Sequence, residues 1–312
     1  MSPQWPHQMM RQSLFDEETT SVSEDISKWD IYGWTLSEKC MAQLITPYNR
    51  NRFGQLIGPR ESQTDLCELE QFAFYDSKSG GLRAYDFSRQ IAFFLLTPSH
   101  SFAEWEIFNP FKEFWHYWAL FHDALLVHSG VVCQNNQALV ILGPGGAGKS
   151  TTTLSCLEFG MKTTGDDFNM LCIDEEKILV YPVFTSLKTK KGNALIMPFK
   201  CLESWAQYAY ANGQKTIYFP KRSDPIWQSG PAQVAAFIEP YWQSQHDQVS
   251  DAKQPGLKGA VGAVLQHPYL AKRYLSATKR MMKTLSCYSL ALSNQPPKNV
   301  ARIKALFALV RH

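Results

Sequence analysis

The sequence has no apolar run long enough to cross a membrane and no cysteine pattern typical of a metal or disulfide site. A membrane-spanning helix needs roughly 18 or more apolar residues with few charges, and the first residues also lack the apolar core of a signal peptide. The seven cysteines are scattered, without a C-x-x-C pair or a Cys/His cluster at metal spacing. These absences predict reduced thiols, a cytoplasmic location and no membrane partner.

Neither sign of charge dominates the 312 residues, whose net charge is +3. Residues 1–130 nevertheless hold 10 Lys and Arg against 17 Asp and Glu, a net −7, whereas residues 131–312 hold 21 against 11, a net +10. The basic part can be a solvated surface, or it can attract a nucleotide or an acidic partner. It contains no recognisable docking motif for nucleic acid, so we do not expect specific nucleic-acid binding.

Local patterns divide the chain into three parts. Residues 1–29 are polar and without a sustained period, which predicts a flexible arm. Residues 30–123 predict a β-rich module, and residues 124–312 the main domain. Nine aromatic residues lie between positions 102 and 121, at helical spacing from Phe111. We expect this helix to pack between the two modules or between subunits of a homo-oligomer.

Strands and helices outside the central motifs are predicted from periodicity and turn residues. In the first 100 residues the expected elements are strands at 29–34, 55–57, 71–75 and 90–96, with a turn at Gly80-Gly81. After the central motifs we expect a strand at 177–183, a strand followed by a helix within 196–210, a strand at 216–220 and a polar loop at 243–258. The last expected elements are a helix at 267–285, a strand at 287–292 and, after a break at Pro296-Pro297, a helix at 300–310.

A phosphate-binding motif stands out near the middle of the chain. The segment Gly143-Pro144-Gly145-Gly146-Ala147-Gly148-Lys149-Ser150 matches G-x-x-x-x-G-K-[ST] at every fixed position, with an apolar run before it and a helix-like segment after it. Glycines let backbone N–H groups turn toward phosphate oxygens, and the helix adds its positive end. The motif predicts a nucleoside triphosphate site, with Lys149 at the β- and γ-phosphates and Ser150 at Mg²⁺. The expected contacts are Gly143, Gly145, Gly146, Ala147, Gly148, Lys149, Ser150 and Thr151.

Two neighbouring carboxylates, Asp166 and Asp167, follow Lys149 by 17 and 18 residues. One carboxylate can hold Mg²⁺ while its neighbour accepts a proton from an attacking hydroxyl, as phosphoryl transfer requires. A solvated turn or a helix cap remains the alternative interpretation. Upstream, residues 124–132 and 138–142 predict a hairpin that puts His128 on a strand beside the loop. A lone histidine in an apolar strand is more often a core residue than a catalytic one.

The order His128, then the phosphate loop, then Gly165-Asp166-Asp167 resembles the bacterial HPr serine kinases and their relatives over about residues 125–190. This resemblance implies an α/β fold with a compact P-loop kinase core of the HPr kinase/PEP carboxykinase type, using ATP and Mg²⁺. It further implies that Asp166 is the general base, that Asp167 and Ser150 bind Mg²⁺, that Lys149 holds the phosphates and that His128 is an active-site residue.

The family's Arg-Gly-x-Gly signature has no counterpart after the acidic pair. In its place stands Ser186-Leu187-Lys188, which resembles an element of HPr-kinase-related proteins, and residues 32–36 loosely resemble their N-terminal modules. We therefore expect neither HPr as the substrate nor the reverse phosphorylase reaction. Basic residues that could stabilise the transferring phosphoryl group are Lys188, Lys190, Lys191 and Arg222.

The sequence thus favours an ATP-dependent kinase that phosphorylates a serine of a peptide or small protein. Two alternatives stay open. One is a kinase of a small molecule such as free serine, and the other is a nucleotide-dependent binding module without catalysis. The intact Asp166-Asp167 pair argues against the second alternative.

Overall fold

A computed structural model describes most of the chain as a mixed α/β protein with two compact units, the first within the described residues up to 100 and the second from Phe108 onward. The described residues are 30–45, 49–50, 56–57, 71–76, 80–86, 88–100, 108–109, 111–122, 124–174, 177–190, 200–210, 213–242 and 271–310. The predicted arm at 1–29 and the polar loop at 243–258 lie outside them. None of the described helices is long and apolar enough to span a membrane.

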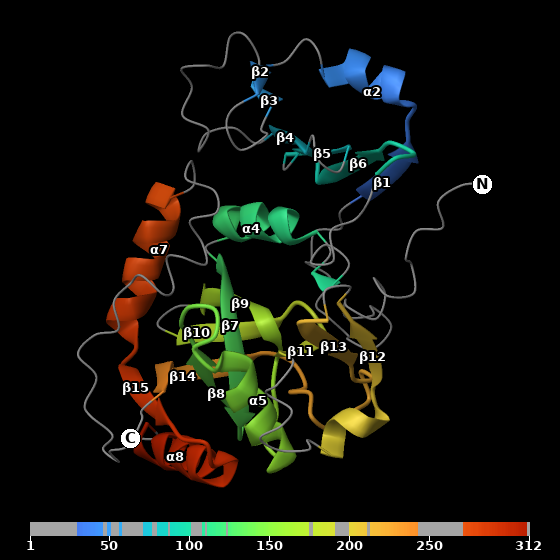
Figure 1. The fold of residues 1–312 in the computed structure, drawn as a ribbon. Helices are drawn as coiled ribbons and strands as arrows, with labels where there is room; N and C mark the ends of the chain where they lie inside the picture. Colours follow the sequence, from blue (N-terminus) through green and yellow to red (C-terminus); the bar gives the residue numbers. More distant parts are fainter. Residues whose placement is uncertain are drawn as a thin grey trace. The chain divides into compact units, whose positions relative to one another are not determined.

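The first unit is built on a four-stranded sheet in the order β1-β6-β5-β4 (Figure 1). Strand β1 (Asp30–Thr35) runs parallel to β6 (Ile91–Leu96), and β5 (Gly81–Asp86) is antiparallel to both β6 and β4 (Gln71–Asp76). The other described elements of this unit are α2 (Glu38–Ile45) and the short pair β2 (Asn49–Arg50) and β3 (Leu56–Ile57). The sequence did not predict β5, because Gly81 was assigned to a turn although only Gly80, with φ of 73°, has a turn conformation.

The second unit contains a six-stranded sheet in the order β10-β9-β7-β8-β14-β15, with an additional pairing between β10 and β14. Its strands are β7 (Ala124–Gln134), β8 (Gln137–Ile141), β9 (Asp166–Asp174), β10 (Lys177–Pro182), β14 (Ala232–Trp242) and β15 (Cys287–Leu292). The predicted hairpin is confirmed as the antiparallel pair of β7 and β8. Strands β8, β14 and β15 are parallel, so their carboxyl ends lie at one edge of the sheet.

The other described elements of the second unit are a three-stranded sheet, four α-helices and one 3₁₀ helix. The small sheet has the order β11 (Leu187–Lys190), β13 (Lys215–Phe219), β12 (Ala206–Ala209), with the 3₁₀ helix η4 (Lys200–Ser204) before β12. The helices are α4 (Lys112–Phe121), α5 (Lys149–Glu158), α7 (Ala271–Thr284) and α8 (Pro296–Leu309). The expected order of strand then helix within 196–210 is wrong, because the described part of this segment begins with η4 and continues with the strand β12. Residues 196–199 lie outside the described residues. Helix α8 starts four residues earlier than expected, because proline is tolerated in the first turn.

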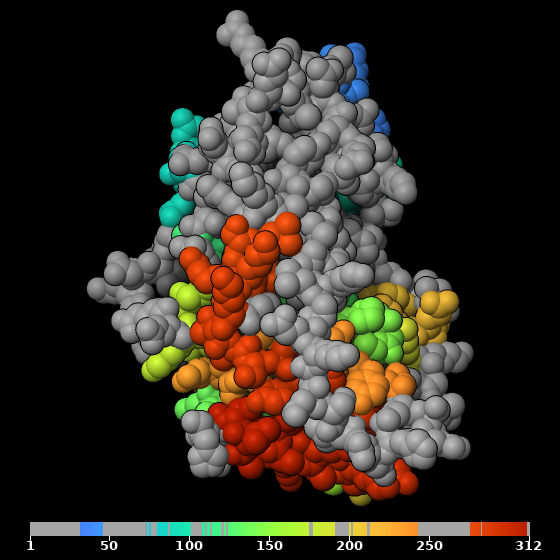
Figure 2. Space-filling model, turned by 90° about the vertical axis from the view of Figure 1, so that its left-hand side faces the viewer, coloured from blue at the N-terminus to red at the C-terminus, as the bar shows by residue number. Residues whose placement is uncertain are grey.

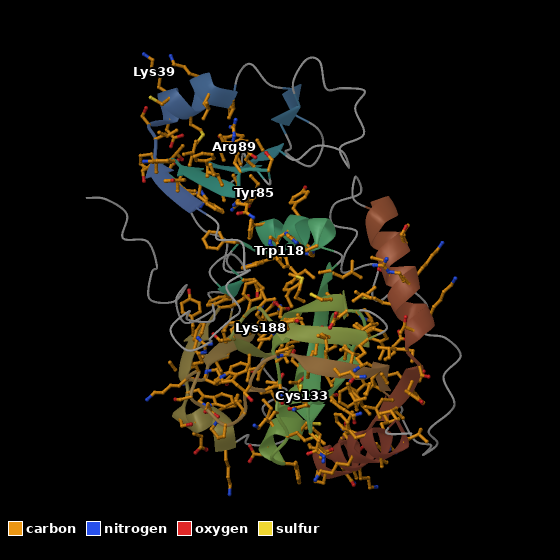
Figure 3. All side chains as sticks on the ribbon, turned by 180° about the vertical axis from the view of Figure 1, so that it is seen from behind. Lys39, Tyr85, Arg89, Trp118, Cys133 and Lys188 are labelled. Atoms are coloured by element: carbon orange, nitrogen blue, oxygen red, sulfur yellow. The ribbon has the colours of Figure 1, made fainter. Side chains whose placement is uncertain are left out.

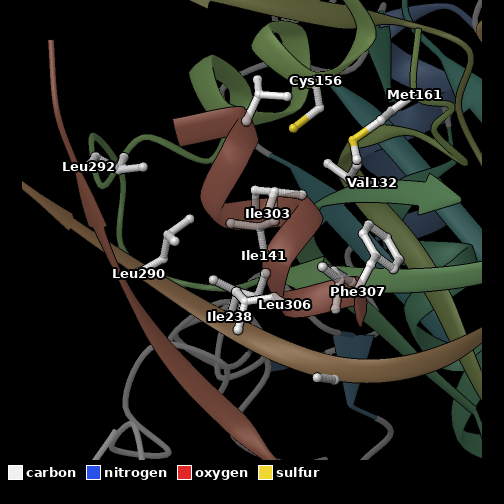
Figure 4. Close-up of a cluster of buried hydrophobic side chains, with 13 residues drawn as sticks. Val132, Ile141, Cys156, Met161, Ile238, Leu290, Leu292, Ile303, Leu306 and Phe307 are labelled. Atoms are coloured by element: carbon white, nitrogen blue, oxygen red, sulfur yellow. The ribbon is translucent and has the colours of Figure 1, made fainter. Parts of the chain in front are cut away.

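The main core of the second unit lies between the six-stranded sheet and the helices α5 and α8 (Figure 4). Helix α8 contributes Val300, Ile303, Leu306 and Phe307, all predicted from its apolar periodicity. They pack on side chains from the sheet and α5 that include Val132, Ile141, Cys156, Ile238 and Leu290. The same α8, with α7 and β15, forms much of the face of this unit seen in Figure 2.

Helix α4 belongs to the second unit. Its Ala119 is fully buried in a cluster with Leu126 of β7, Met170 of β9 and Phe184, and Trp118 (labelled in Figure 3) packs against that cluster. The boundary between the two units therefore falls near residue 107 instead of after residue 123. The reason is that side chains of α4 pack against β7 and β9. The contribution of this helix to a homo-oligomer stays a prediction.

Helix α5 crosses β7 closely at Gly130. A Cβ at this position would lie 2.5 Å from Thr153 Oγ1 and 3.5 Å from Asp166 Oδ1. We expect Gly130→Ala to lower the free energy of unfolding by about 1–3 kcal/mol, because the extra methyl must displace α5 or a buried side chain. Thermal or urea unfolding measures the effect. Gly145→Ala is the control, since a Cβ at Gly145 meets nothing within 4 Å, and equal stability of the two variants would contradict this account.

Candidate active site

The phosphate-loop sequence forms the turn between β8 and α5. Three of its glycines have a positive φ, namely Gly143 (137°), Gly146 (88°) and Gly148 (104°). A Cβ on Gly148 would also overlap the Leu292 side chain, so this position requires glycine for two reasons. Residues 144–146 at the apex are exposed. The loop therefore has the strand–loop–helix setting that the motif needs, with its apex open to a ligand.

Lys149 folds back onto its own loop. Its Nζ donates hydrogen bonds to the carbonyl oxygens of Gly143, over 2.8 Å, and of Pro144, over 3.2 Å. Burial lowers the pKa of Lys149, while the carboxylates of Asp166 and Asp167 act in the opposite direction. A buried cation with neutral partners favours an anion beside it, and a phosphate held in the loop would be such an anion.

Asp166 opens β9 and is almost completely enclosed, with 1% of its surface exposed. The backbone N–H of Lys188 donates to its Oδ2 over 3.3 Å. Burial raises the pKa of Asp166 to about 6, and the charge of Asp167 adds to this rise, whereas hydrogen bonding with the Ser150 side chain opposes it. The Ser150 hydroxyl in the first turn of α5 is therefore close to the Asp166 carboxylate.

Asp167 is held by three other side chains. Its Oδ1 lies 3.1 Å from His128 Nε2, and its Oδ2 accepts a hydrogen bond from Asn109 Nδ2 over 2.7 Å and forms an ion pair with Lys188. Burial alone would raise the pKa of Asp167, but Lys188 and His128 hold it well below its ordinary range. The side chains of Asp167 and His128 keep exposed fractions of 16% and 33%. The Asp167 side chain is therefore less enclosed than that of Asp166, which is 1% exposed.

The backbone at Asp167 is strained, with φ of 90°. Such a conformation costs a residue other than glycine about 1–3 kcal/mol. Consecutive residues of a regular strand point to opposite faces. Here both aspartates contact Lys188. Asp166 accepts a hydrogen bond from the backbone N–H of Lys188, and Asp167 accepts one from its side-chain Nζ. The positive φ breaks the alternation and lets both carboxylates line one site.

A buried hydrogen-bond network fixes the turn before this strained residue. Asn169 Nδ2 donates to the Ser129 carbonyl over 3.0 Å, and Thr164 Oγ1 donates to Asn169 Oδ1 over 2.9 Å. The Thr163 hydroxyl donates to the Val131 carbonyl over 2.7 Å. All of these polar side chains are buried, so breaking one bond would leave a buried group unsatisfied. The network ties the aspartate pair to β7.

Lysines of the small sheet surround the loop. Lys188, labelled in Figure 3, points from β11 to Asp167 of β9, and Lys190 lies two residues further on the same strand. Lys190 Nζ lies 3.6 Å from the Cβ position of Gly146, and Lys215 is its cross-strand partner on β13. Like charges placed opposite each other are unfavourable unless an anion is near. The structure thus gathers lysines where phosphate groups are expected.

The structure bears less directly on the other two predicted basic residues. Arg222 lies in the turn after β13, and Lys191 lies outside the described residues. That turn carries Asp224, whose carboxylate accepts a hydrogen bond from Trp205 Nε1 over 2.7 Å. The contacts of Lys188 with Asp167 and of Lys190 with the loop apex make these two lysines the phosphate contacts that the described geometry supports.

Sequence reasoning missed Asn109, Asn169 and Lys215. Asn109 stands before the proline that opens the predicted helix, a position where asparagine is ordinary as a cap, and only the fold brings it to Asp167. Asn169 comes two residues after the acidic pair. A polar residue inside an otherwise apolar strand could have indicated that its side chain has a structural partner there. Lys215 belongs to the basic stretch between residues 188 and 222, and its place opposite Lys190 required the strand pairing.

The donor set at this site fits one Mg²⁺ ion. No group of three His, Cys, Asp or Glu side chains suited to a metal occurs in the part of the chain that the structure describes. Mg²⁺ at a nucleotide needs only one or two protein oxygens, because phosphates and water supply the others. Asp166 Oδ1 is buried without a hydrogen-bond partner among the described residues, and the Ser150 hydroxyl is close to the same carboxylate. The expected partner of Ser150 was Asp167, but Asp167 is turned toward His128 and Lys188.

Comparison with known proteins adds little to this geometry. No family model matches the chain, and none of the curated proteins matches it. Among solved structures, the chain is similar to the Hpr(Ser) kinase/phosphatase from Coxiella burnetii, with a TM-score of 0.31 and 12% sequence identity over 58% of this chain and 96% of the other. So low a TM-score does not establish a common fold, and any proposal about function rests on the site itself.

Proposed function

We propose that this protein is an ATP-dependent kinase that transfers the γ-phosphoryl group to a hydroxyl, with a serine of a peptide or small protein as the acceptor. The observation that carries the proposal is the joining of two half-sites in one unit. The start of α5 and Asp166 meet at Gly130, whose Cβ position lies 3.4 Å from the Lys149 carbonyl oxygen and 3.5 Å from Asp166 Oδ1. Asp167, the next residue, contacts His128 and Lys188.

In the donor half, the loop N–H groups and Lys149 bind the β- and γ-phosphates, and Lys190 reaches the loop apex. Ser150 and Asp166 hold Mg²⁺, which when bound neutralises charge on the β- and γ-phosphate oxygens. Lys188 stabilises the phosphoryl group during transfer, when charge is spread over its oxygens. Binding of phosphate by Lys188 also releases Asp167 from its ion pair.

In the acceptor half, we assign the general base to Asp167 in place of Asp166. A base must come within hydrogen-bond distance of the acceptor hydroxyl, and Asp166 is 1% exposed whereas the Asp167 side chain is 16% exposed. His128 and Asn109 orient the Asp167 carboxylate. The acceptor oxygen forms a bond to the γ-phosphorus as the bond to the bridging oxygen breaks, and the hydroxyl proton moves to Asp167.

Ser150→Ala tests the donor half. We expect wild-type protein to bind the non-hydrolysable analogue AMP-PNP more tightly with Mg²⁺ than with EDTA, and the variant to lose most of this difference, because one oxygen ligand is gone. Calorimetric titration of both proteins under both conditions measures it. Binding in EDTA is the internal control, and an unchanged Mg²⁺ effect in the variant would rule out Ser150 as a ligand.

The acceptor class is tested by incubating the purified protein with γ-labelled ATP and an extract of its native cells. Label in the protein or peptide fraction supports the proposal. Label in small molecules would instead identify a kinase of a metabolite, and an absence of transfer by protein that binds AMP-PNP would identify a binding module.

A further inference from the structure

Strand β14 extends past the end of its neighbour β8. The two strands pair in parallel up to Ile238 opposite Ile141, and β14 continues to Trp242. Just after β8 ends, the Leu142 N–H donates to the Ile238 carbonyl over 2.7 Å. The last four residues of β14 therefore run alongside the phosphate loop, at the sheet edge where ligands of parallel strands bind.

Alternate residues at this end of β14 line the side of the loop. Pro240 Cδ lies 3.9 Å from the Cβ position of Gly143, and Trp242 Cζ2 and Nε1 each lie 3.7 Å from that of Gly148. Residues two apart on a strand share a face. The indole of Trp242 thus lies within van der Waals distance of the place that a Cβ would take on the glycine that precedes Lys149.

A large part of Trp242 is exposed to solvent. The residue is 44% exposed, whereas its partner across the strand pair, Leu292, is 1% exposed and packs beneath Gly148. A large aromatic ring with one edge against a phosphate loop and its remainder in solvent is the arrangement of a stacking surface. Phe159 is similarly exposed in this unit, but it follows the opposite end of α5.

We propose that Trp242 is the platform on which the nucleobase of the phosphoryl donor stacks. This inference rests on the proposed function, because it takes the loop as the binding site of the donor's phosphates. Every nucleobase has a π face, so stacking favours any nucleoside triphosphate over inorganic polyphosphate and discriminates weakly between adenine and guanine. The donor is then a nucleoside triphosphate, as the loop motif predicts, and Trp242 adds a contact to its base.

The test compares two ligands that share phosphates but not a base. Calorimetry gives the dissociation constants of Mg²⁺–AMP-PNP and Mg²⁺–tripolyphosphate for wild type, Trp242→Ala and Trp242→Phe. We expect Trp242→Ala to weaken AMP-PNP binding about tenfold, from the stacking energy of one base, and to leave tripolyphosphate binding unchanged. Trp242→Phe keeps an aromatic ring and recovers most of the affinity for AMP-PNP.

Trp34→Ala in the first unit is the matched control, since Trp34 is 48% exposed and should change neither constant. If Trp242→Ala weakened the binding of AMP-PNP and tripolyphosphate by the same factor, Trp242 would only support the loop and the inference would be overturned. Unchanged AMP-PNP affinity would overturn it as well. Both outcomes leave the proposed kinase intact, whereas wild-type protein that binds neither ligand would remove the proposed function too.

Discussion

Replacing Asp167 with asparagine is expected to slow phosphoryl transfer by about 10²- to 10⁴-fold while leaving AMP-PNP binding close to that of wild type. Asparagine has the size of aspartate and keeps an oxygen for His128 or Asn109, but it cannot take the hydroxyl proton. The initial rate of label transfer from γ-labelled ATP measures the first effect, and calorimetry with Mg²⁺–AMP-PNP measures the second.

Asp166→Asn is the matched control for this prediction. Because Asp166 is buried beside Ser150, its substitution should weaken Mg²⁺-dependent binding as well as transfer. The two variants therefore separate metal binding from proton acceptance. If Asp167→Asn transferred phosphate at the wild-type rate while Asp166→Asn lost transfer alone, the base would be Asp166, as the family resemblance implies.

Lys149→Met is expected to reduce transfer by about 10²- to 10³-fold and to weaken nucleotide binding as well. Methionine preserves the apolar stem of the side chain but removes the buried ammonium that now bonds to the Gly143 and Pro144 carbonyls. The variant therefore loses the cation that would meet the β- and γ-phosphates. Rates of label transfer and calorimetric titration with AMP-PNP check both effects.

Lys177→Met is the control for removal of a lysine, because Lys177 is exposed on β10, away from the loop. Its transfer rate and AMP-PNP affinity should equal those of wild type. Circular dichroism of both variants shows whether the fold is kept. A correctly folded Lys149→Met protein that binds AMP-PNP as tightly as wild type would exclude this loop as the nucleotide site.

Elements with a strong local pattern were predictable from the sequence. The β7–β8 hairpin follows from two apolar runs joined by a polar turn, and the inward face of α8 follows from its periodicity. Strand β14 was not predicted, since it contains Pro240 and pairs in parallel with strands far away in the sequence. Pro240 is tolerated because it lies beyond the end of the β8 pairing, where β8 needs no N–H from it.

In the candidate site, too, some features follow from local sequence and others depend on contacts between distant residues. The loop from Gly143 to Ser150 is specified by contiguous residues, so its motif was sufficient to place it. Which aspartate faces Ser150 depends on the positive φ of Asp167, and this conformation is enforced by buried polar contacts between β7 and β9. The spacing of residues in the sequence therefore cannot predict which aspartate faces Ser150. Asn109 and Trp242 likewise reach the site only through tertiary packing.

The central claim is that the loop and Asp167 form one phosphotransfer site, and phosphoserine formation tests it most directly. Wild type and Asp167→Asn are incubated with γ-labelled Mg²⁺–ATP and an extract of the native cells, and the labelled products are analysed for phosphoserine. Phosphoserine is expected to accumulate with wild type and not with the variant, although both bind AMP-PNP. Wild-type protein that binds Mg²⁺–AMP-PNP but forms no phosphorylated product would contradict it.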